Sequence, residues 1–202
     1  MPVAYIKEVA PDVKLGLWKI EETALKFLSD SLDMRELFDS EISAYKSNSR
    51  RLEKLAVYSL LWKMTNSKIR ISHNEAGKPI VDGYNISISH TRGYASVILS
   101  KLKNVAVDIE YYTDRVARIA DKFIRKDEIA PDIDSQLINW SVKETVYKYF
   151  SEQSLQYFDM KLMPFEEFEN TKRVFNLKMN SYLDVYYELN DKYVLTYTYH
   201  KD

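Results

Sequence analysis

The sequence predicts an α+β protein, because helical and extended patterns follow one another along its 202 residues. In residues 50–64, apolar side chains recur at three- and four-residue steps, which predicts a strong helix. Between residues 69 and 100, short alternating segments are bounded by three of the chain's four glycines, which indicates strands joined by tight turns. A short apolar strand at Val105–Glu110 and a second helical pattern around Trp140–Phe150 continue the mixture.

The elements of the first hundred residues are predicted from spacing and from capping residues. Strands are predicted at residues 3–9, 69–72, 79–81, 86–90 and 94–100. Helices are predicted at residues 21–29, 34–38 and 50–64. Ser47, Asn48 and Ser49 are N-cap candidates for the last of these helices.

The second half shows the same alternation of patterns. Thr113 is predicted to cap a helix at residues 114–124, and a further helix carries Leu137 to Phe150. Strands are predicted at residues 171–178, 182–189 and 192–199, with a hairpin at Asn190-Asp191 between the last two.

Composition sets limits on function. Hydrophobic residues make up 46% and charged residues 29%, which is typical of a globular chain long enough to bury a core in one domain or two small halves. No apolar run approaches the roughly 20 residues of a membrane span, and no leader-like N-terminus is visible. The absence of cysteine is compatible with the cytoplasm, where we expect the protein. A net charge of −1 argues against a general nucleic-acid binder.

The strand Val105–Glu110 ends in two acids on one face, because side chains two apart on a strand point the same way. Asp108 and Glu110 would repel each other unless a cation lay between them. A small set of hard oxygen ligands suits Mg²⁺, whose coordination is usually completed by water and substrate phosphates. The alternative is a solvated strand end with two ordinary acids.

A second chemical segment places Glu144 and Lys148 one helical turn apart, on a face that also carries large apolar groups. A surface ion pair is the plain interpretation. A third carboxylate with a lysine one turn on is also what a site for a metal and a pyrophosphate needs.

Hydroxyl and imidazole groups gather at the end of the strand at residues 86–90. Ser89, His90 and Thr91 precede Gly93, and a turn of this kind can hold a phosphate. Lys78, before Pro79, is a further possible phosphate contact. The alternative is a β-turn with polar residues.

A basic segment follows the acidic strand. It is either a solvated face or a surface for an acidic protein partner, and Glu128 after it is expected to point back towards the acids. Its cations are Arg115, Arg118, Lys122, Arg125 and Lys126.

Four motifs resemble those of the 4′-phosphopantetheinyl transferases of the single-chain, surfactin-synthetase-activating type, and they follow one another along the chain in the family's order. Val105–Glu110 resembles the family's Gly-Val-Asp-Ile-Glu, with Ala106 in place of glycine. Trp140-Ser141-Val142-Lys143-Glu144 with Lys148 resembles Trp-Ser-x-Lys-Glu-(x)3-Lys. Ile88–Thr91 is similar to the Asn-x-Ser-His-Ser turn, with Ser87 at the asparagine position, and Gly77-Lys78-Pro79 to its Gly-Lys-Pro lead-in. The match covers residues 50–150, and neither departure removes a group that the reaction needs.

The resemblance implies an α+β fold of two similar halves in a pseudo-twofold arrangement with the active site between them. Residues 1–104 would form the N-terminal half, and residues 105–202 would form the C-terminal half with the acidic strand and the Trp-Ser-x-Lys-Glu helix.

The resemblance also implies a reaction, the transfer of 4′-phosphopantetheine from coenzyme A to a serine of an acyl or peptidyl carrier protein. Asp108, Glu110 and Glu144 would hold Mg²⁺, and Lys148 would hold the pyrophosphate. Glu144 would take the serine proton with Lys143 orienting it, and Glu128 stays open as the base. The remaining contacts to coenzyme A would come from His90, Ser89, Thr91, Lys78 and one of Arg50 or Arg51, with Arg51 the predicted choice.

Two other classes of function remain open. The chain is alternatively a homologue that binds coenzyme A without transferring it, or a tyrosine-rich interaction module with structural acids. We expect a monomer. The carrier, its pathway (fatty-acid or secondary-metabolite biosynthesis) and the preference between free and acylated coenzyme A are left open by the sequence.

Overall fold

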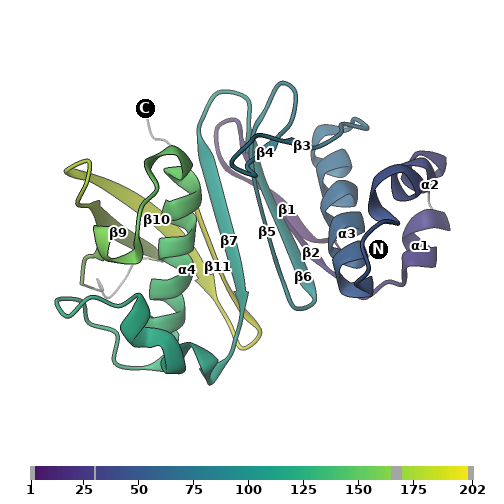
Figure 1. Ribbon diagram of the computed structural model, residues 1–202. Coiled ribbons are helices and arrows are strands. Elements are labelled where there is room, and N and C mark those ends of the chain that lie inside the picture. The colour runs from purple at the N-terminus through teal and green to yellow at the C-terminus, as the bar shows by residue number, and fades with distance from the viewer. Residues whose placement is uncertain (1–2, 30, 165–169, 200–202) are drawn as a thin grey trace. The chain divides into compact units, whose positions relative to one another are not determined.

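The structure, a computed structural model, describes residues 3–29, 31–164 and 170–199. It separates into two compact units, Met1–Leu102 and Lys103–Asp202. Each unit packs one long helix against an antiparallel sheet (Figure 1), which confirms the α+β class. The pseudo-twofold relation stays a prediction. Within the described ranges, no helix is long and apolar enough to cross a membrane.

The N-terminal unit is built on a four-stranded sheet. Its strands are β1 (Val3–Ala10), β2 (Val13–Lys19), β5 (Asn85–Thr91) and β6 (Tyr94–Ser100), in the order β1-β2-β6-β5 with every neighbour antiparallel. A separate ribbon pairs β3 (Ser72–His73) with β4 (Pro79–Ile80). The helices are α1 (Ala24–Ser29), α2 (Leu32–Leu37), the π-helical turn η1 (Phe38–Ile42) and α3 (Asn48–Thr65).

Helix α3 organises this unit because it packs on β2 and β6. Ser47, one of the three predicted candidates, is its N-cap and accepts a hydrogen bond from the Arg50 backbone N–H. Leu55 and Leu60 on its inner face are fully buried. The helix stops at Asn66, whose φ of 52° turns the backbone into the left-handed region.

Strand β2 was not predicted. Its burial is nearly continuous along both faces, so it lacks the alternation of a half-buried strand. Gly16 interrupts it, and that glycine is needed for packing. A Cβ atom there would lie 2.8 Å from both Leu60 Cδ1 and Met64 Sδ, so the Leu60 and Met64 side chains would have to shift to admit it.

The C-terminal unit is built on a five-stranded antiparallel sheet. Its strands are β7 (Val105–Tyr111), β8 (Met160–Leu162), β9 (Thr171–Asn176), β10 (Ser181–Leu189) and β11 (Tyr193–Tyr199), in the order β7-β11-β10-β9-β8. Its helices are α4 (Ile133–Tyr149) and the 3₁₀ helices η2 (Asp114–Lys122), η3 (Ser151–Gln153) and η4 (Tyr157–Asp159). Helix α4 packs across β7, β11 and β10.

Two helix predictions need correction. Residues 114–122 form a 3₁₀ helix, although Thr113 caps it as expected by accepting from the Arg115 N–H. Val116 and Ile119 are three residues apart and eclipse each other in a 3₁₀ helix, which places them on one side. Helix α4 begins earlier than predicted, because Asp132 and Ser135 form a reciprocal capping box.

Candidate active site

The acidic end of β7 is joined to α4 by a buried hydroxyl network. Asp108 lies opposite Thr196 of β11 and is 3% exposed. The Ser141 hydroxyl donates to Asp108 Oδ2 at 2.8 Å, and its oxygen lies 2.9 Å from Thr196 Oγ1. Thr145 Oγ1 lies 2.6 Å from the same threonine oxygen. These bonds fix the height and rotation of α4 against the strand that carries the acids.

Two further residues of α4 contact the acids directly. Trp140 Nε1 donates to Glu110 Oε1 at 2.9 Å. Lys148 Nζ donates to Asp108 Oδ1 at 2.8 Å and to the Val107 carbonyl at 3.1 Å. The structure therefore brings together Asp108, Glu110 and the helix face that the sequence singled out.

Glu144 is held on the same helix by a residue that the sequence analysis missed. The Tyr157 hydroxyl of η4 donates to Glu144 Oε1 at 2.7 Å. The Tyr157 ring also packs against Trp140, with ring centroids 5.2 Å apart. No motif marks Tyr157, which comes from a short turn after α4. Only its place in the fold identifies it.

Glu110 and Glu144 sit in an environment that disfavours their charge. Burial, and then the charge of Asp108, raise the pKa of Glu110 to about 7. Burial also raises the pKa of Glu144, with Asp108 adding to the effect against the hydrogen bond from Tyr157. Three acids and one lysine leave an excess of negative charge that a bound cation would neutralise.

The donor set of this acid cluster (Asp108, Glu110 and Glu144) fits Mg²⁺ in chemistry, since all three are carboxylates. Among the residues that the structure describes, no group of three or more His, Cys, Asp or Glu side chains is arranged to hold a metal ion. Lys148 contacts the one acid that would be central to such a site. The assignment of Mg²⁺ to these acids, and of the pyrophosphate to Lys148, therefore stays a proposal.

Lys143 and Glu128, predicted to take part in catalysis, form a pair of their own. Their charged atoms are 2.8 Å apart, and the side chains are 0% and 1% exposed. Lys143 Nζ also donates to the Phe123 carbonyl, while Glu128 Oε1 accepts from the Leu162 N–H. Lys143 thus contacts Glu128 rather than Glu144. This arrangement favours a structural role for both residues.

In the N-terminal unit, the predicted phosphate-binding histidine lies in a cationic pocket of about 160 Å³. Arg50 donates to the His90 ring, and the Glu53 carboxylate lies 3.2 Å from Arg50 and 3.4 Å from His90. Lys54 and His73 add to the lining. The pocket therefore has the charge that an anionic ligand requires.

The other predicted coenzyme A contacts differ in their setting. Ser89 and Thr91 flank His90 on β5 and are buried. Arg51 donates to the carbonyls of Tyr45 and Ser43, so the structure favours Arg50 over Arg51 as the partner of His90. The Lys78 backbone N–H is held by Asn74 Oδ1 at 2.8 Å, which fixes the turn between β3 and β4.

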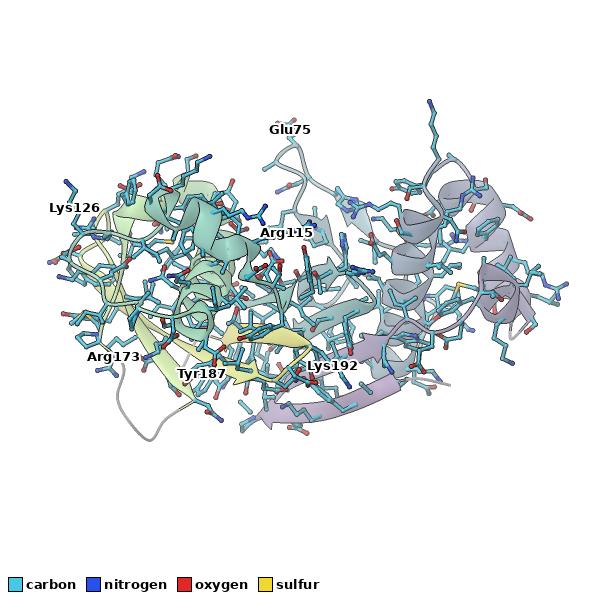
Figure 2. The ribbon with its side chains drawn as sticks, turned by 90° about the horizontal axis from the view of Figure 1, so that it is seen from below. Glu75, Arg115, Lys126, Arg173, Tyr187 and Lys192 are labelled. Carbon is cyan, nitrogen blue, oxygen red and sulfur yellow. The ribbon has the colours of Figure 1, made fainter. Side chains whose placement is uncertain are left out.

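The basic segment is largely unpaired within the part of the chain that the structure describes. Arg118, Lys122 and Lys126 are exposed and have no ion pair with a described residue. Figure 2 shows Arg115 and Lys126 well apart on the C-terminal unit. Arg115 lines a pocket of about 200 Å³ together with Glu110 and Trp140, which places one end of the segment beside the acid cluster. Arg125 is instead bound to Asp127.

Residues 104–198 match the family model described as the 4′-phosphopantetheinyl transferase superfamily. These residues form a domain of that superfamily. The matched region spans β7 to β11 and so contains every member of the acid cluster. No curated protein matches the chain.

The match of residues 104–198 to the 4′-phosphopantetheinyl transferase superfamily agrees with the resemblance seen in the motifs of β7 and α4. The match does not extend to the N-terminal unit, where the Ser-His-Thr turn and the Gly-Lys-Pro segment lie. The single-chain subtype is therefore still a prediction, and so are the roles of individual residues.

Proposed function

We propose that the protein transfers the 4′-phosphopantetheine group of coenzyme A to a serine of an apo acyl or peptidyl carrier protein. The observation that carries this proposal is the meeting of Asp108, Glu110 and Glu144 at one place in a domain of the transferase superfamily. The serine oxygen forms a bond to the phosphorus that bears pantetheine. The bond from that phosphorus to the leaving phosphate breaks, and 3′,5′-ADP departs.

Glu144 is the residue best suited to take the serine proton. Burial raises its pKa, which makes it a stronger base than an exposed glutamate. The hydrogen bond from Tyr157 holds one oxygen in place, so the carboxylate is oriented before the carrier arrives. In this proposal Tyr157, rather than Lys143, is the residue that positions Glu144.

Charge at the reacting phosphates is the second requirement. When bound by Asp108, Glu110 and Glu144, Mg²⁺ would neutralise charge that builds up on the 5′-phosphate of the leaving 3′,5′-ADP. The Lys148 side chain is 28% exposed, and its ammonium is hydrogen-bonded to Asp108. It is therefore able to exchange the carboxylate for a phosphate oxygen.

His90 and Arg50 would hold the 3′-phosphate of coenzyme A. Their ring and guanidinium groups already contact each other, so a shared anion would be bound by two cationic or donor groups at once. Lys54 adds positive charge to the same pocket.

Intact-mass analysis of purified apo carrier proteins tests the proposal. Incubation with coenzyme A and Mg²⁺ should add one phosphopantetheine mass to a carrier, and a carrier lacking the serine should be unchanged. Fatty-acid, polyketide and peptide-synthetase carriers are compared in parallel. Binding of coenzyme A without a mass increase on any carrier would instead identify a homologue without transferase activity. Absence of coenzyme A binding would point to an interaction module.

A further inference from the structure

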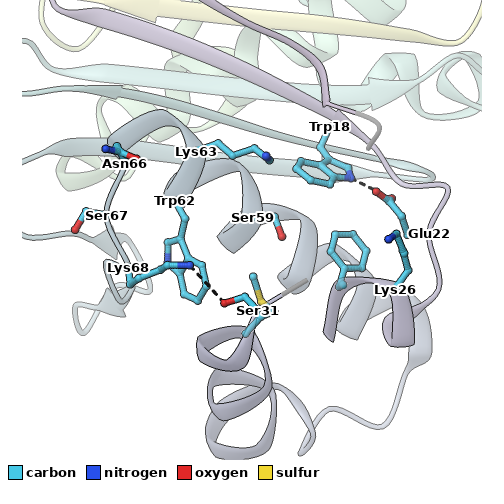
Figure 3. A pocket seen from close by; sticks show the side chains of 12 residues that line it. Trp18, Glu22, Lys26, Ser31, Ser59, Trp62, Lys63, Asn66, Ser67 and Lys68 are labelled. Carbon is cyan, nitrogen blue, oxygen red and sulfur yellow. Dashed lines mark hydrogen bonds between the residues drawn. The ribbon is translucent and has the colours of Figure 1, made fainter. Parts of the chain in front are cut away.

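The N-terminal unit contains a second pocket, which lies outside the matched domain and shares no residue with the pocket around His90. Its volume is about 370 Å³, within the range of small-molecule sites in proteins. Strand β2 and helices α1, α2 and α3 contribute to it (Figure 3). A pocket of this size that is lined mainly by apolar side chains is a candidate ligand site.

The walls of this pocket are apolar and well ordered by their own contacts. Trp18 and Phe27 pack with ring centroids 5.6 Å apart. Trp62 Nε1 donates to the Ile69 carbonyl, and Trp18 Nε1 donates to Glu22. Both indole N–H groups are therefore satisfied elsewhere, and the rings present carbon surfaces to the pocket. An apolar body is the ligand that such walls favour.

One polar group lies in the middle of the apolar wall. Ser59 is on α3, and Figure 3 shows its hydroxyl directed into the pocket. Within the described residues, this hydroxyl has no hydrogen-bond partner. It is able to donate to an oxygen of a ligand.

The rim of the pocket is cationic, with Lys26, Lys63 and Lys68 set against Glu22. Lys68 is already engaged, because its ammonium lies 3.4 Å from Asp33 and 4.5 Å from the centre of the Trp62 ring. Lys63 is exposed and has no ion pair with a described residue. The rim therefore offers Lys63 as a cation for an anionic head group.

We propose that this pocket binds a small amphipathic carboxylate, with its apolar body between Trp18 and Trp62 and its head group at Lys63. Ser59 would donate to the same ligand. A medium-chain fatty acid and an arylalkyl carboxylate share this chemistry. The proposal is independent of the transfer reaction, because none of these residues belongs to the acid cluster or to the His90 pocket.

Calorimetric titration of the full chain with decanoate and with 4-phenylbutyrate tests the proposal, and decanol is the uncharged control. At least one carboxylate should bind saturably, with a Kd on the order of 0.1 mM, and should raise the melting temperature. Stronger binding of decanoate would identify an acyl ligand, and stronger binding of 4-phenylbutyrate an aromatic one. No saturable binding of either carboxylate, or equal binding of decanol, would overturn the proposal.

Two variants locate the ligand. Lys63→Glu should weaken carboxylate binding about tenfold by removing a charge-assisted contact, while Lys46→Glu, at an exposed position outside the pocket, should leave the Kd unchanged. Ser59→Leu should reduce binding by filling the cavity, and its melting temperature reports whether it folds. Unchanged binding by Lys63→Glu would contradict the proposed orientation, whatever the outcome for Ser59→Leu.

Discussion

Helix α4 carries two lysines five residues apart, each paired with a buried carboxylate, and the two pairs differ in the exposure of the lysine and in the groups around it. Lys143 and Glu128 are 2.8 Å apart, as are Lys148 and Asp108. The first pair is fully buried, and both oxygens of its carboxylate accept hydrogen bonds. The second pair has a partly exposed ammonium and two further acids beside it.

This difference separates a structural pair from the pair that we propose to take part in the reaction. A buried pair whose hydrogen bonds are all made has nothing to gain from a ligand, and breaking it leaves an uncompensated charge. One lysine beside three carboxylates does not balance their charge, which is the reason that we propose a cation site there. The sequence motif contains both lysines, but their different surroundings favour a structural role for Lys143 and a ligand-binding role for Lys148.

The largest expected effect is on stability, at the buried pair. Lys143→Met should lower the free energy of unfolding by about 3–5 kcal/mol, because it leaves Glu128 buried and unpaired. Urea denaturation monitored by circular dichroism measures this. Lys148→Met should cost less, because the Lys148 side chain is 28% exposed and Ser141 still donates to Asp108. If the Lys143→Met protein keeps wild-type stability but loses transfer activity, Lys143 has a catalytic role and not a structural one.

The second prediction concerns Glu110 and pH. Its pKa of about 7 in the folded protein lies above the ordinary value of 4.5, so the folded state holds a proton that the unfolded state has released. Stability should therefore fall as pH rises from about 4.5 to about 7, by an amount on the order of 3 kcal/mol. Glu110→Gln should remove this loss and melt higher than wild type at pH 8, with no gain at pH 4.

Melting curves of wild type and Glu110→Gln, recorded between pH 4 and pH 8, measure this change in stability. Asp121→Asn, at an exposed position, is the control for removing one negative charge. If the melting temperature of Glu110→Gln depends on pH in the same way as that of wild type, Glu110 is not the group that causes the loss of stability.

A smaller effect is expected at the N-terminal pocket. His90→Ala and Arg50→Ala should each weaken coenzyme A binding about tenfold, by removing one charge-assisted contact. Dephospho-coenzyme A, which lacks the 3′-phosphate, should be insensitive to both changes. Arg51→Ala is the matched neighbour, because Arg51 binds backbone carbonyls instead. Equal losses with both ligands would mean that His90 and Arg50 do not contact the 3′-phosphate.

The smallest effect concerns the carrier protein. We propose that the exposed cations of the basic segment attract an acidic carrier, because the chain as a whole carries a net charge of −1. Arg118→Glu with Lys122→Glu should raise the KM for the carrier a few-fold and leave that for coenzyme A nearly unchanged. Added salt should act in the same direction. Carrier saturation that the double reversal leaves unaltered would place the docking surface elsewhere.

Periodicity and capping predicted most of the fold. Helix α3 and strand β7 lie where the spacing of their apolar residues indicated. Strand β2 was not predicted, because it is buried on both faces and is interrupted by Gly16. The role of that glycine is visible only in its packing against the side chains of α3. The η2 segment was predicted as an α-helix, since a charged stretch with few buried residues does not distinguish the two helix types.

The candidate site was predictable where a regular element positions it. The two-residue period of a strand placed Asp108 and Glu110 together, and the helical period placed Glu144 and Lys148 on one face. Tyr157 and the pairing of Lys143 with Glu128 were not predictable, because they join segments that only the tertiary fold brings together. Choosing Arg50 over Arg51 likewise needed the position of His90.

The central claim is that the acid cluster is a cation site serving coenzyme A. Calorimetric titration of coenzyme A with and without Mg²⁺, on wild type and on Asp108→Asn, tests it most directly. This substitution keeps an oxygen for the Ser141 hydrogen bond and removes one negative charge. Mg²⁺ should tighten binding to wild type and have little effect on Asp108→Asn. An undiminished Mg²⁺ effect in a folded Asp108→Asn protein would contradict the account.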